Sequence, residues 1–149
     1  MPNRELTTST RYVQLTEPQT RNAAFRSAYV DLRGWDAVDI VIDHGDVTAA
    51  GGANTLTATL QEDDGVGLPT AIATYGAVAA ADRTGAFTVL GDGVTTANSV
   101  VGYRGGRRYI HVNVALAGAS SAVVGITAVL RKYGRQPSNT VAVTTGAVV

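Results

Sequence analysis

The chain has 149 residues, 12 basic and 12 acidic side chains, and no cysteine. A chain of about 150 residues buries about 68–70% of its unfolded surface, so this length fits one domain that needs no disulfide or metal to fold. The lack of cysteine excludes disulfides, thiol nucleophiles and cysteine-ligated zinc sites. Binding to phosphate backbones requires a basic excess, so the balanced charge predicts no nucleic-acid partner.

The composition favours strands and turns. Ala, Val, Thr and Gly are abundant, whereas Glu and Lys, which stabilise amphipathic helices, are scarce. We therefore expect an all-β protein.

The opening residues have no apolar segment of the kind that a secretory signal needs. No later stretch approaches the roughly 20 apolar residues of a membrane-spanning helix. We therefore expect no membrane partner.

The first part of the chain divides into an arm and two strands. Residues 1–24 are polar and show neither a helical period nor a sustained alternation, which predicts an extended N-terminal arm. Residues 28–32 alternate and end at the Arg33-Gly34 turn, so they predict a first strand. Residues 35–43 place β-branched side chains on one face with a period of two, and they are the clearest strand of this part.

The middle of the chain is less regular. A third strand is predicted at 55–61, and the acidic turn Glu62-Asp63-Asp64-Gly65 ends it. A weaker strand follows at 70–75. Residues 76–85 are compatible with a short helical turn or a loop, and 87–89 predict a further short strand.

The last part of the chain contains the strongest alternation. Residues 99–104 predict a strand, and Gly105-Gly106 after it indicates a tight hairpin. Residues 110–116 and 122–130 alternate throughout, and we predict that they pair with each other as a hairpin. Residues 134–149 predict a second arm or a final edge strand.

About eight short strands with one-sided alternation are typical of a two-sheet antiparallel sandwich. We predict a jelly-roll-like β-sandwich domain over residues 25–133, with arms at 1–24 and 134–149. The apolar side chains that share a face in each strand define the expected core: Val30, Val38, Ile40, Ile42, Leu56, Leu60, Phe87, Ile110, Val112, Val114, Val124, Ile126 and Leu130.

Residues that could carry out catalysis are few. His44 follows a strand and His111 occupies an outward strand position, and neither belongs to a spaced set of metal ligands, so both are predicted surface or rim residues. Ser120-Ser121 lacks the G-x-S-x-G elbow, although a triad assembled in space stays open. We predict no catalytic, cofactor or metal site, and no enzyme activity.

Acidic residues form two groups. Glu62, Asp63 and Asp64 do not follow the alternating ligand pattern of a calcium loop, so a solvated turn is favoured over a calcium site. A second group is expected to line the polar faces of two adjacent strands, which is usually the wet side of a sheet, with a carboxylate pair for glycoside hydrolysis as an open alternative. Its members are Asp31, Asp36, Asp39 and Asp43.

The densest basic group is Arg104, Arg107 and Arg108, flanked by Tyr103 and Tyr109. Such a mixture can bind nucleic acid by stacking and charge. In a chain of zero net charge, ion pairs with a neighbouring acidic chain or with its own Asp-rich strand are favoured instead.

The order of three segments resembles a known class of proteins. VDLRGWDAVDIVIDHG, TLTATLQEDDG and VVGYRGGRRYIHVNVAL occur in the order seen in small head proteins of tailed bacteriophages and prophage-like particles, the decoration, cement or stabilisation proteins. The resemblance covers about residues 28–137 and is most specific at 31–35, 60–65 and 103–112. The family often has serine before the acidic turn where this chain has Glu62, and the alanine-rich residues 77–81 have no counterpart there.

This resemblance implies a β-sandwich subunit on the outer surface of a virion, synthesised in the bacterial cytoplasm. It implies the major capsid protein as partner and a homo-oligomer, a dimer or a trimer. Bridging neighbouring capsid subunits stabilises the shell by the free energy of binding. We expect flexible termini to contribute, and the arginines of the N-terminal arm and the glycine pair are the candidate contacts: Arg4, Arg11, Arg21, Arg104, Arg107 and Arg108.

Other functions stay open at this stage. A carbohydrate-binding sandwich needs a row of exposed aromatic side chains, and those available are scattered over different strands. A head-fibre or spike component of the virion fits the same resemblance. A jelly-roll enzyme needs a metal cluster or a carboxylate pair inside a cavity.

Overall fold

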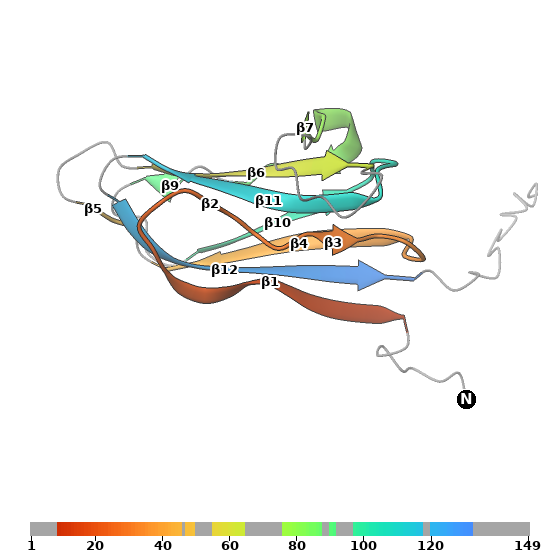
Figure 1. Ribbon diagram of the computed structural model, residues 1–149, viewed down its shortest axis with the longest axis horizontal. Helices are drawn as coiled ribbons and strands as arrows, with labels where there is room; N and C mark the ends of the chain where they lie inside the picture. The colour runs from red at the N-terminus through yellow and green to blue at the C-terminus, as the bar shows by residue number, and fades with distance from the viewer. Residues whose placement is uncertain are drawn as a thin grey trace, which may run out of the picture.

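The computed structural model describes residues 9–45, 47–49, 55–64, 76–87, 90–91, 97–117 and 120–132. Two antiparallel sheets pack face to face, with the long strands of both sheets running along the same axis (Figure 1). This arrangement confirms the predicted all-β sandwich. No helix among the described residues is long and apolar enough to cross a membrane.

The first sheet has the order β1-β12-β4-β10-β8, and β5 pairs with the start of β12. The bounds of its strands are Thr10–Arg21 (β1), Ala37–His44 (β4), Thr48–Ala49 (β5), Arg83–Thr84 (β8), Ala97–Tyr103 (β10) and Ser120–Arg131 (β12).

The second sheet has the order β2-β11-β6-β7, with β3 also paired to β11 and β9 also paired to β6. Its strands are Phe25–Arg26 (β2), Val30–Asp31 (β3), Thr55–Asp63 (β6), Gly76–Ala77 (β7), Leu90–Gly91 (β9) and Tyr109–Leu116 (β11). Its central pair joins β6 and β11 in continuous register from Asp63 opposite Tyr109 to Leu56 opposite Leu116.

The pairings are nested along the chain. The outermost pair is β1 with β12, followed inward by β2 and β3 with β11, β4 with β10, and β6 with β7 and β9. A single long hairpin rolled up in this way is a jelly roll, with its pairs distributed over two sheets. The predicted jelly-roll arrangement is therefore confirmed.

The two predicted hairpins near the C-terminus are wrong. β11 pairs with β6 in the second sheet, whereas β12 pairs with β1 and β4 in the first. The residues after β10 likewise lead from the first sheet into the second, so Gly105-Gly106 is not a hairpin turn. Alternation reveals which face a strand buries, but it contains no information about which strand lies beside it.

The predicted N-terminal arm is wrong for residues 10–21, which form β1 at the edge of the first sheet. The register with β12 shifts between Gln14 and Thr16 and again between Thr16 and Gln19. These irregularities bury Leu15 and Thr16 in succession and interrupt the alternation. Residues 1–8 and 134–149 of the predicted arms lie outside the described residues, and residues 22–24 connect β1 to β2 outside any strand.

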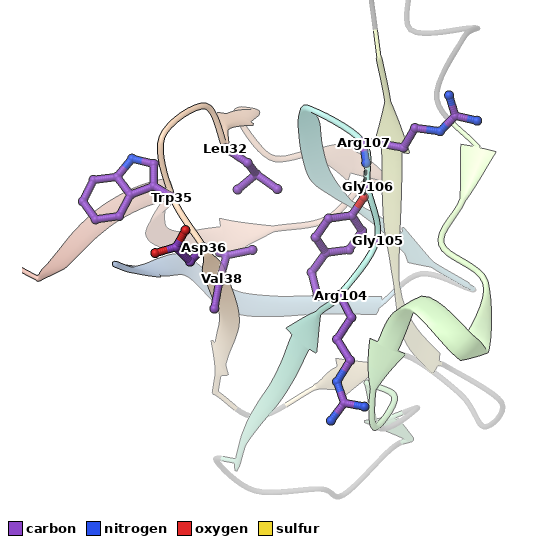
Figure 2. Close-up of a pocket in the computed structure, with 10 residues that line it drawn as sticks. Leu32, Trp35, Asp36, Val38, Arg104, Gly105, Gly106 and Arg107 are labelled. Atoms are coloured by element: carbon purple, nitrogen blue, oxygen red, sulfur yellow. Dashed lines mark hydrogen bonds between the residues drawn. The ribbon is translucent and has the colours of Figure 1, made fainter. Parts of the chain in front are cut away.

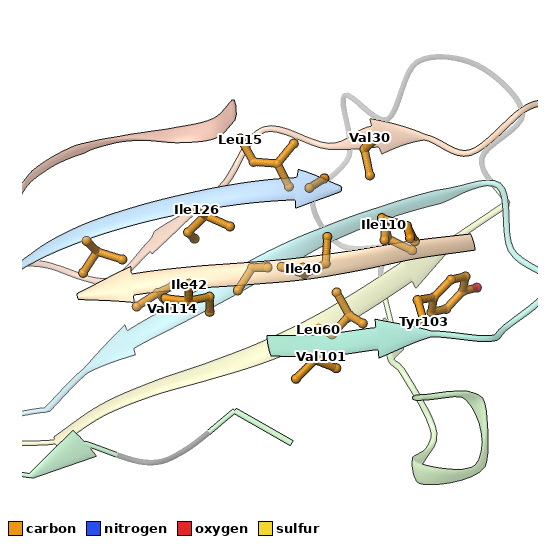
Figure 3. Packing of buried hydrophobic residues seen from close by; sticks show 14 of the residues in the cluster. Leu15, Val30, Ile40, Ile42, Leu60, Val101, Tyr103, Ile110, Val114 and Ile126 are labelled. Carbon is orange, nitrogen blue, oxygen red and sulfur yellow. The ribbon is translucent and has the colours of Figure 1, made fainter. Parts of the chain in front are cut away.

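The core lies between the sheets (Figure 3). Of the thirteen predicted core residues only Phe87 is not fully buried, and it packs against the cluster from its rim. Sequence reasoning missed seven buried side chains, which come from β1, β10, loops and alanine positions: Leu15, Val47, Val78, Val101, Tyr103, Ala122 and Ala128.

The central strands follow the predictions closely, and the short ones do not. Three predicted strands correspond to β4, β6 and β10 within a few residues. The strand predicted at 28–32 shortens to β3. The strand predicted at 70–75 lies outside the described residues, as do Thr88 and Val89 of the one at 87–89, and Phe87 is not in a strand.

The flanks of the sandwich are crossed by short segments. The 3-10 helix η2 (Ala80–Asp82) connects β7 of the second sheet to β8 of the first (Figure 1). The Val78 N–H donates to the Leu60 carbonyl at 3.0 Å. On the opposite flank the Ala28 N–H donates to the Leu15 carbonyl at 2.9 Å, which joins β1 to the start of the second sheet.

Candidate functional site

Both terminal directions of the described chain leave the sandwich at the same end. The Lys132 N–H, just after β12, donates to the carbonyl of Ser9, just before β1, at 2.7 Å. The loops 32–36 and 104–108 lie at this end too, since β4 begins and β10 ends there (Figure 1). We call this region, formed by Ser9, Lys132 and the two loops, the terminal end.

A buried tyrosine anchors the loop 104–108 to the second sheet. The Tyr103 hydroxyl donates to Glu62 Oε2 at 2.5 Å and accepts the Arg107 N–H at 2.9 Å. Burial, and secondarily the hydrogen bond with Glu62, raises the pKa of Tyr103 far above its usual range. The hydroxyl therefore stays protonated and acts as a permanent link between β10, β6 and the loop.

The two arginines after the glycine pair hold the same loop. Arg107 forms an ion pair with Asp64, whose other carboxylate oxygen accepts the Arg108 N–H at 3.2 Å. Arg108 binds Asp31 through Nε at 3.0 Å and Nη2 at 2.7 Å, and its guanidinium lies 4.8 Å from the Tyr109 ring. This bidentate contact lowers the pKa of Asp31. The predicted pairing with the protein's own Asp-rich group is therefore confirmed for Arg108, whereas Arg107 pairs with the acidic turn.

A cavity of about 220 Å³ opens between the loops 32–36 and 104–108 (Figure 2). It arises because β4 and β10 diverge after the pair Val38 and Tyr103. The Asp36 N–H donates to the Arg131 carbonyl of β12 at 3.0 Å, whereas the Arg104 N–H donates to the Asp82 carbonyl of η2 at 2.7 Å. The start of β4 therefore bonds toward β12, and the end of β10 bonds toward η2.

The cavity wall combines apolar side chains with backbone. Leu32, Val38 and Tyr103 line the cavity. Asp36 and Trp35 stand on the side of the first loop (Figure 2). A Cβ at Gly105 would lie 2.4 Å from the Tyr103 hydroxyl oxygen, so this position requires glycine. Lys132 Nζ lies 5.7 Å from the centre of the Trp35 ring, which links the end of β12 to the rim.

The six predicted contact arginines do not form one group. Arg104 and Arg11 are exposed near the terminal end, and Arg104 makes no ion pair with any described residue; its guanidinium points away from the cavity (Figure 2). Arg107 and Arg108 make the ion pairs given above. Arg21 lies at the opposite end, 4.6 Å from the Phe25 ring centre. Arg4 lies outside the described residues.

The prediction that both histidines are surface or rim residues is wrong. His44 is buried on the core side of β4, with its Nδ1–H donating to the Gly45 carbonyl at 3.0 Å. His111 is buried on the outer side of β11, where its Nε2–H donates to Gln61 Oε1 at 2.9 Å. Burial, with a smaller contribution from the charge of Arg26, lowers the pKa of His111 to about 4.

The predicted stripe of acidic residues on two adjacent strands is also wrong. Asp31 belongs to β3 in the second sheet, whereas Asp39 and Asp43 belong to β4 in the first. Asp39 pairs with Arg131 at 3.0 Å. Among the described residues no group of three or more His, Asp or Glu side chains converges as metal ligands would.

No protein-family model matches the chain, and no curated protein matches it.

Sequence reasoning missed the hydrogen bond between Tyr103 and Glu62, because the two residues lie 41 positions apart. The only signal for it is an aromatic side chain directly before a glycine and arginine loop, in a chain that also has an acidic turn.

Proposed function

We propose that this chain is a structural protein of a tailed-phage or prophage-like virion. In this proposal it binds the outer surface of the capsid through the terminal end and stabilises the shell by bridging neighbouring major capsid subunits. The observation that supports this most is the common exit of both terminal directions beside an exposed arginine, Arg104, on a fixed loop. Three binding elements can thereby reach one surface.

The fold is compatible with this function. Jelly rolls occur in viral capsid proteins and in lectins, although a fold class alone does not determine function. The order of the segments around DLRGW, LQEDDG and YRGGRRYIHV provides the link to phage head proteins.

In this proposal the arginines have different roles. Arg107 and Arg108 hold the loop through Asp64 and Asp31, so they position it rather than contact the capsid. Arg104 and Arg11 are the direct contacts. A preformed loop loses little conformational entropy on binding, which favours affinity.

Stabilisation follows from linkage. A ligand that binds only the assembled shell stabilises it by about 2.7 kcal/mol per site at one hundred times Kd. The terminal segments 1–8, which include Arg4, and 134–149 lie outside the described residues, and the proposal assigns them further contacts with the capsid. We propose that the protein acts as a homo-oligomer, a dimer or a trimer, and has no catalytic role.

The test is co-sedimentation with undecorated capsids assembled from the major capsid protein of the same genome. Wild type should sediment with the capsids and raise their opening temperature. Arg104→Gln should weaken binding about tenfold, the effect of about 1.4 kcal/mol. Arg26→Gln, on the exposed flank of the second sheet, is the matched control and should bind within about twofold of wild type. A wild-type protein that stays in the supernatant would overturn the proposal.

The cavity favours one alternative, a carbohydrate-binding module. Trp35 and Asp36 at its rim combine an aromatic face with a carboxylate, a combination suited to a small saccharide. A glycan array with wild type and Trp35→Ala separates the two functions. Capsid binding that survives Trp35→Ala supports the main proposal, and glycan binding that the variant loses supports the alternative. A head-fibre or spike role would appear as binding at isolated positions of the virion rather than over the lattice.

A further inference from the structure

We infer that the edge of β1 over residues 10–14 is a self-association site, at which the same segment of a second copy adds in antiparallel orientation across a twofold axis. This inference needs no capsid, and its test uses the isolated full-length protein. Its failure is therefore distinguishable from failure of the proposed function.

The open backbone groups of this edge can be assigned. The Lys132 N–H bonds the Ser9 carbonyl, so Ser9 directs its backbone groups toward β12. Because such groups alternate along an antiparallel pair, Arg11 and Val13 also face β12. Thr10, Tyr12 and Gln14 then direct their N–H and carbonyl groups away from the sheet, and no described residue pairs with them.

The edge has a defined length. After Gln14 the register with β12 shifts, and the Leu15 carbonyl accepts the Ala28 N–H at 2.9 Å. Pro18 follows, which cannot donate a backbone hydrogen bond. The segment available to a partner strand is therefore TRYVQ, residues 10–14.

This segment is complementary to itself. In an antiparallel pair centred on Tyr12, each Tyr12 exchanges both backbone hydrogen bonds with its copy, and Thr10 does the same with Gln14. The two Tyr12 side chains, each 73% exposed in the single chain, then face each other as a favourable aromatic cross-strand pair. Arg11 lies opposite Val13, so no like charges meet directly, and the chain has no net formal charge to keep copies apart.

The other described sheet edges are less suited. On the far side of the first sheet β8 has two residues, adjoins η2 and pairs with Gly102 and Tyr103 of β10, so residues 97–101 of β10 are paired on that side with no described strand. In the second sheet β2, β3, β7 and β9 are also two residues long. A long unpaired edge can add a strand from another chain, and β1 is the described edge whose open segment is complementary to itself around an exposed aromatic side chain, Tyr12.

The decisive variant is Tyr12→Pro, measured by sedimentation velocity over about 1–100 μM. Proline removes an N–H that faces away from β12, so the ladder between β1 and β12 stays intact. Wild type should form a dimer, and the variant should weaken it by at least about 100-fold. Val100→Ser, which changes a 56% exposed valine on the outer face of the same sheet, is the matched control and should dimerise like wild type.

Amide exchange gives a second readout that needs no variant. The amides of Thr10, Tyr12 and Gln14 should be protected at high concentration and exchange quickly on dilution. A wild-type monomer at 100 μM, about the top of the range, would overturn the inference. So would a trimer without a dimer, or a dimer that Tyr12→Pro leaves unchanged; loss of the dimer in Val100→Ser would assign the contact to the sheet face instead.

Discussion

The outer faces of the two sheets differ in how far their side chains are buried. On the second sheet, outward side chains contact one another and become buried. His111 hydrogen-bonds Gln61, and the Tyr109 ring packs against the Tyr29 ring in a T-shaped arrangement. On the first sheet, Tyr12, Val100 and Val123 stay exposed. The outward side chains of the second sheet therefore cover one another in part, whereas the first sheet keeps exposed apolar side chains and the open edge of β1.

The largest expected effect comes from acid. The unfolded chain binds a proton at His111 near pH 6.5, but the folded chain does so only near its pKa of about 4. Stability from this group is therefore complete above about pH 6.5 and is lost as the pH falls toward 4, by about 3 kcal/mol. Urea unfolding at pH 7 and at pH 4.5 measures it. In His111→Gln this part of the pH dependence should disappear, and an unchanged slope would show that the acid sensitivity lies elsewhere.

The tyrosine link gives the next effect. Tyr103→Phe leaves the Arg107 N–H without its acceptor and Glu62 without its donor, so it should lower the free energy of unfolding by about 1–3 kcal/mol. A double-mutant cycle with Glu62→Gln should show coupling between the two positions. Additive effects would mean that the link contributes nothing beyond packing.

A glycine pair tests the rigidity of the same loop with a built-in control. In Gly105→Ala the new Cβ would lie 2.4 Å from the Tyr103 hydroxyl oxygen, so we expect a loss of about 1–2 kcal/mol from displaced packing. At Gly106 a Cβ meets nothing within 4 Å, and Gly106→Ala should be close to neutral. Thermal unfolding of both variants measures their stability. Equal losses of stability in the two variants would contradict a closely packed loop.

The smallest effect is expected on the first sheet. Val100→Thr and Val123→Thr keep a β-branched side chain at exposed positions and should change stability by less than about 0.5 kcal/mol. A clear loss in either variant, measured by urea unfolding, would show that this face is covered in solution.

The sequence allowed the faces of the long strands to be predicted, but not their neighbours. Val38, Ile40 and Ile42 are buried as their alternation predicted, because alternation reports burial directly. The pairing of β11 with β6 depends on how connections cross between sheets, which no local pattern records. β1 was missed because its bulge places Leu15 and Thr16 together in the interior.

Of the candidate site, the sequence allowed only the pairing of opposite charges to be predicted. Arg108 has a partner among the acidic residues that the sequence suggested, Asp31. The outward position of His111 was predicted, but its burial was not, because burial on an outer face depends on the side chains of neighbouring strands such as Gln61. The cavity could not be predicted either, since it results from the divergence of β4 and β10.

Cryo-electron microscopy of capsids mixed with the full-length protein tests the central proposal most directly. We expect regular density for the jelly roll on the shell, with the terminal end, including the loop 104–108, against the capsid and the opposite end, with Arg21, directed away from it. Density that places the opposite end or a sheet face against the shell would contradict the account, and so would bare capsids at saturating protein.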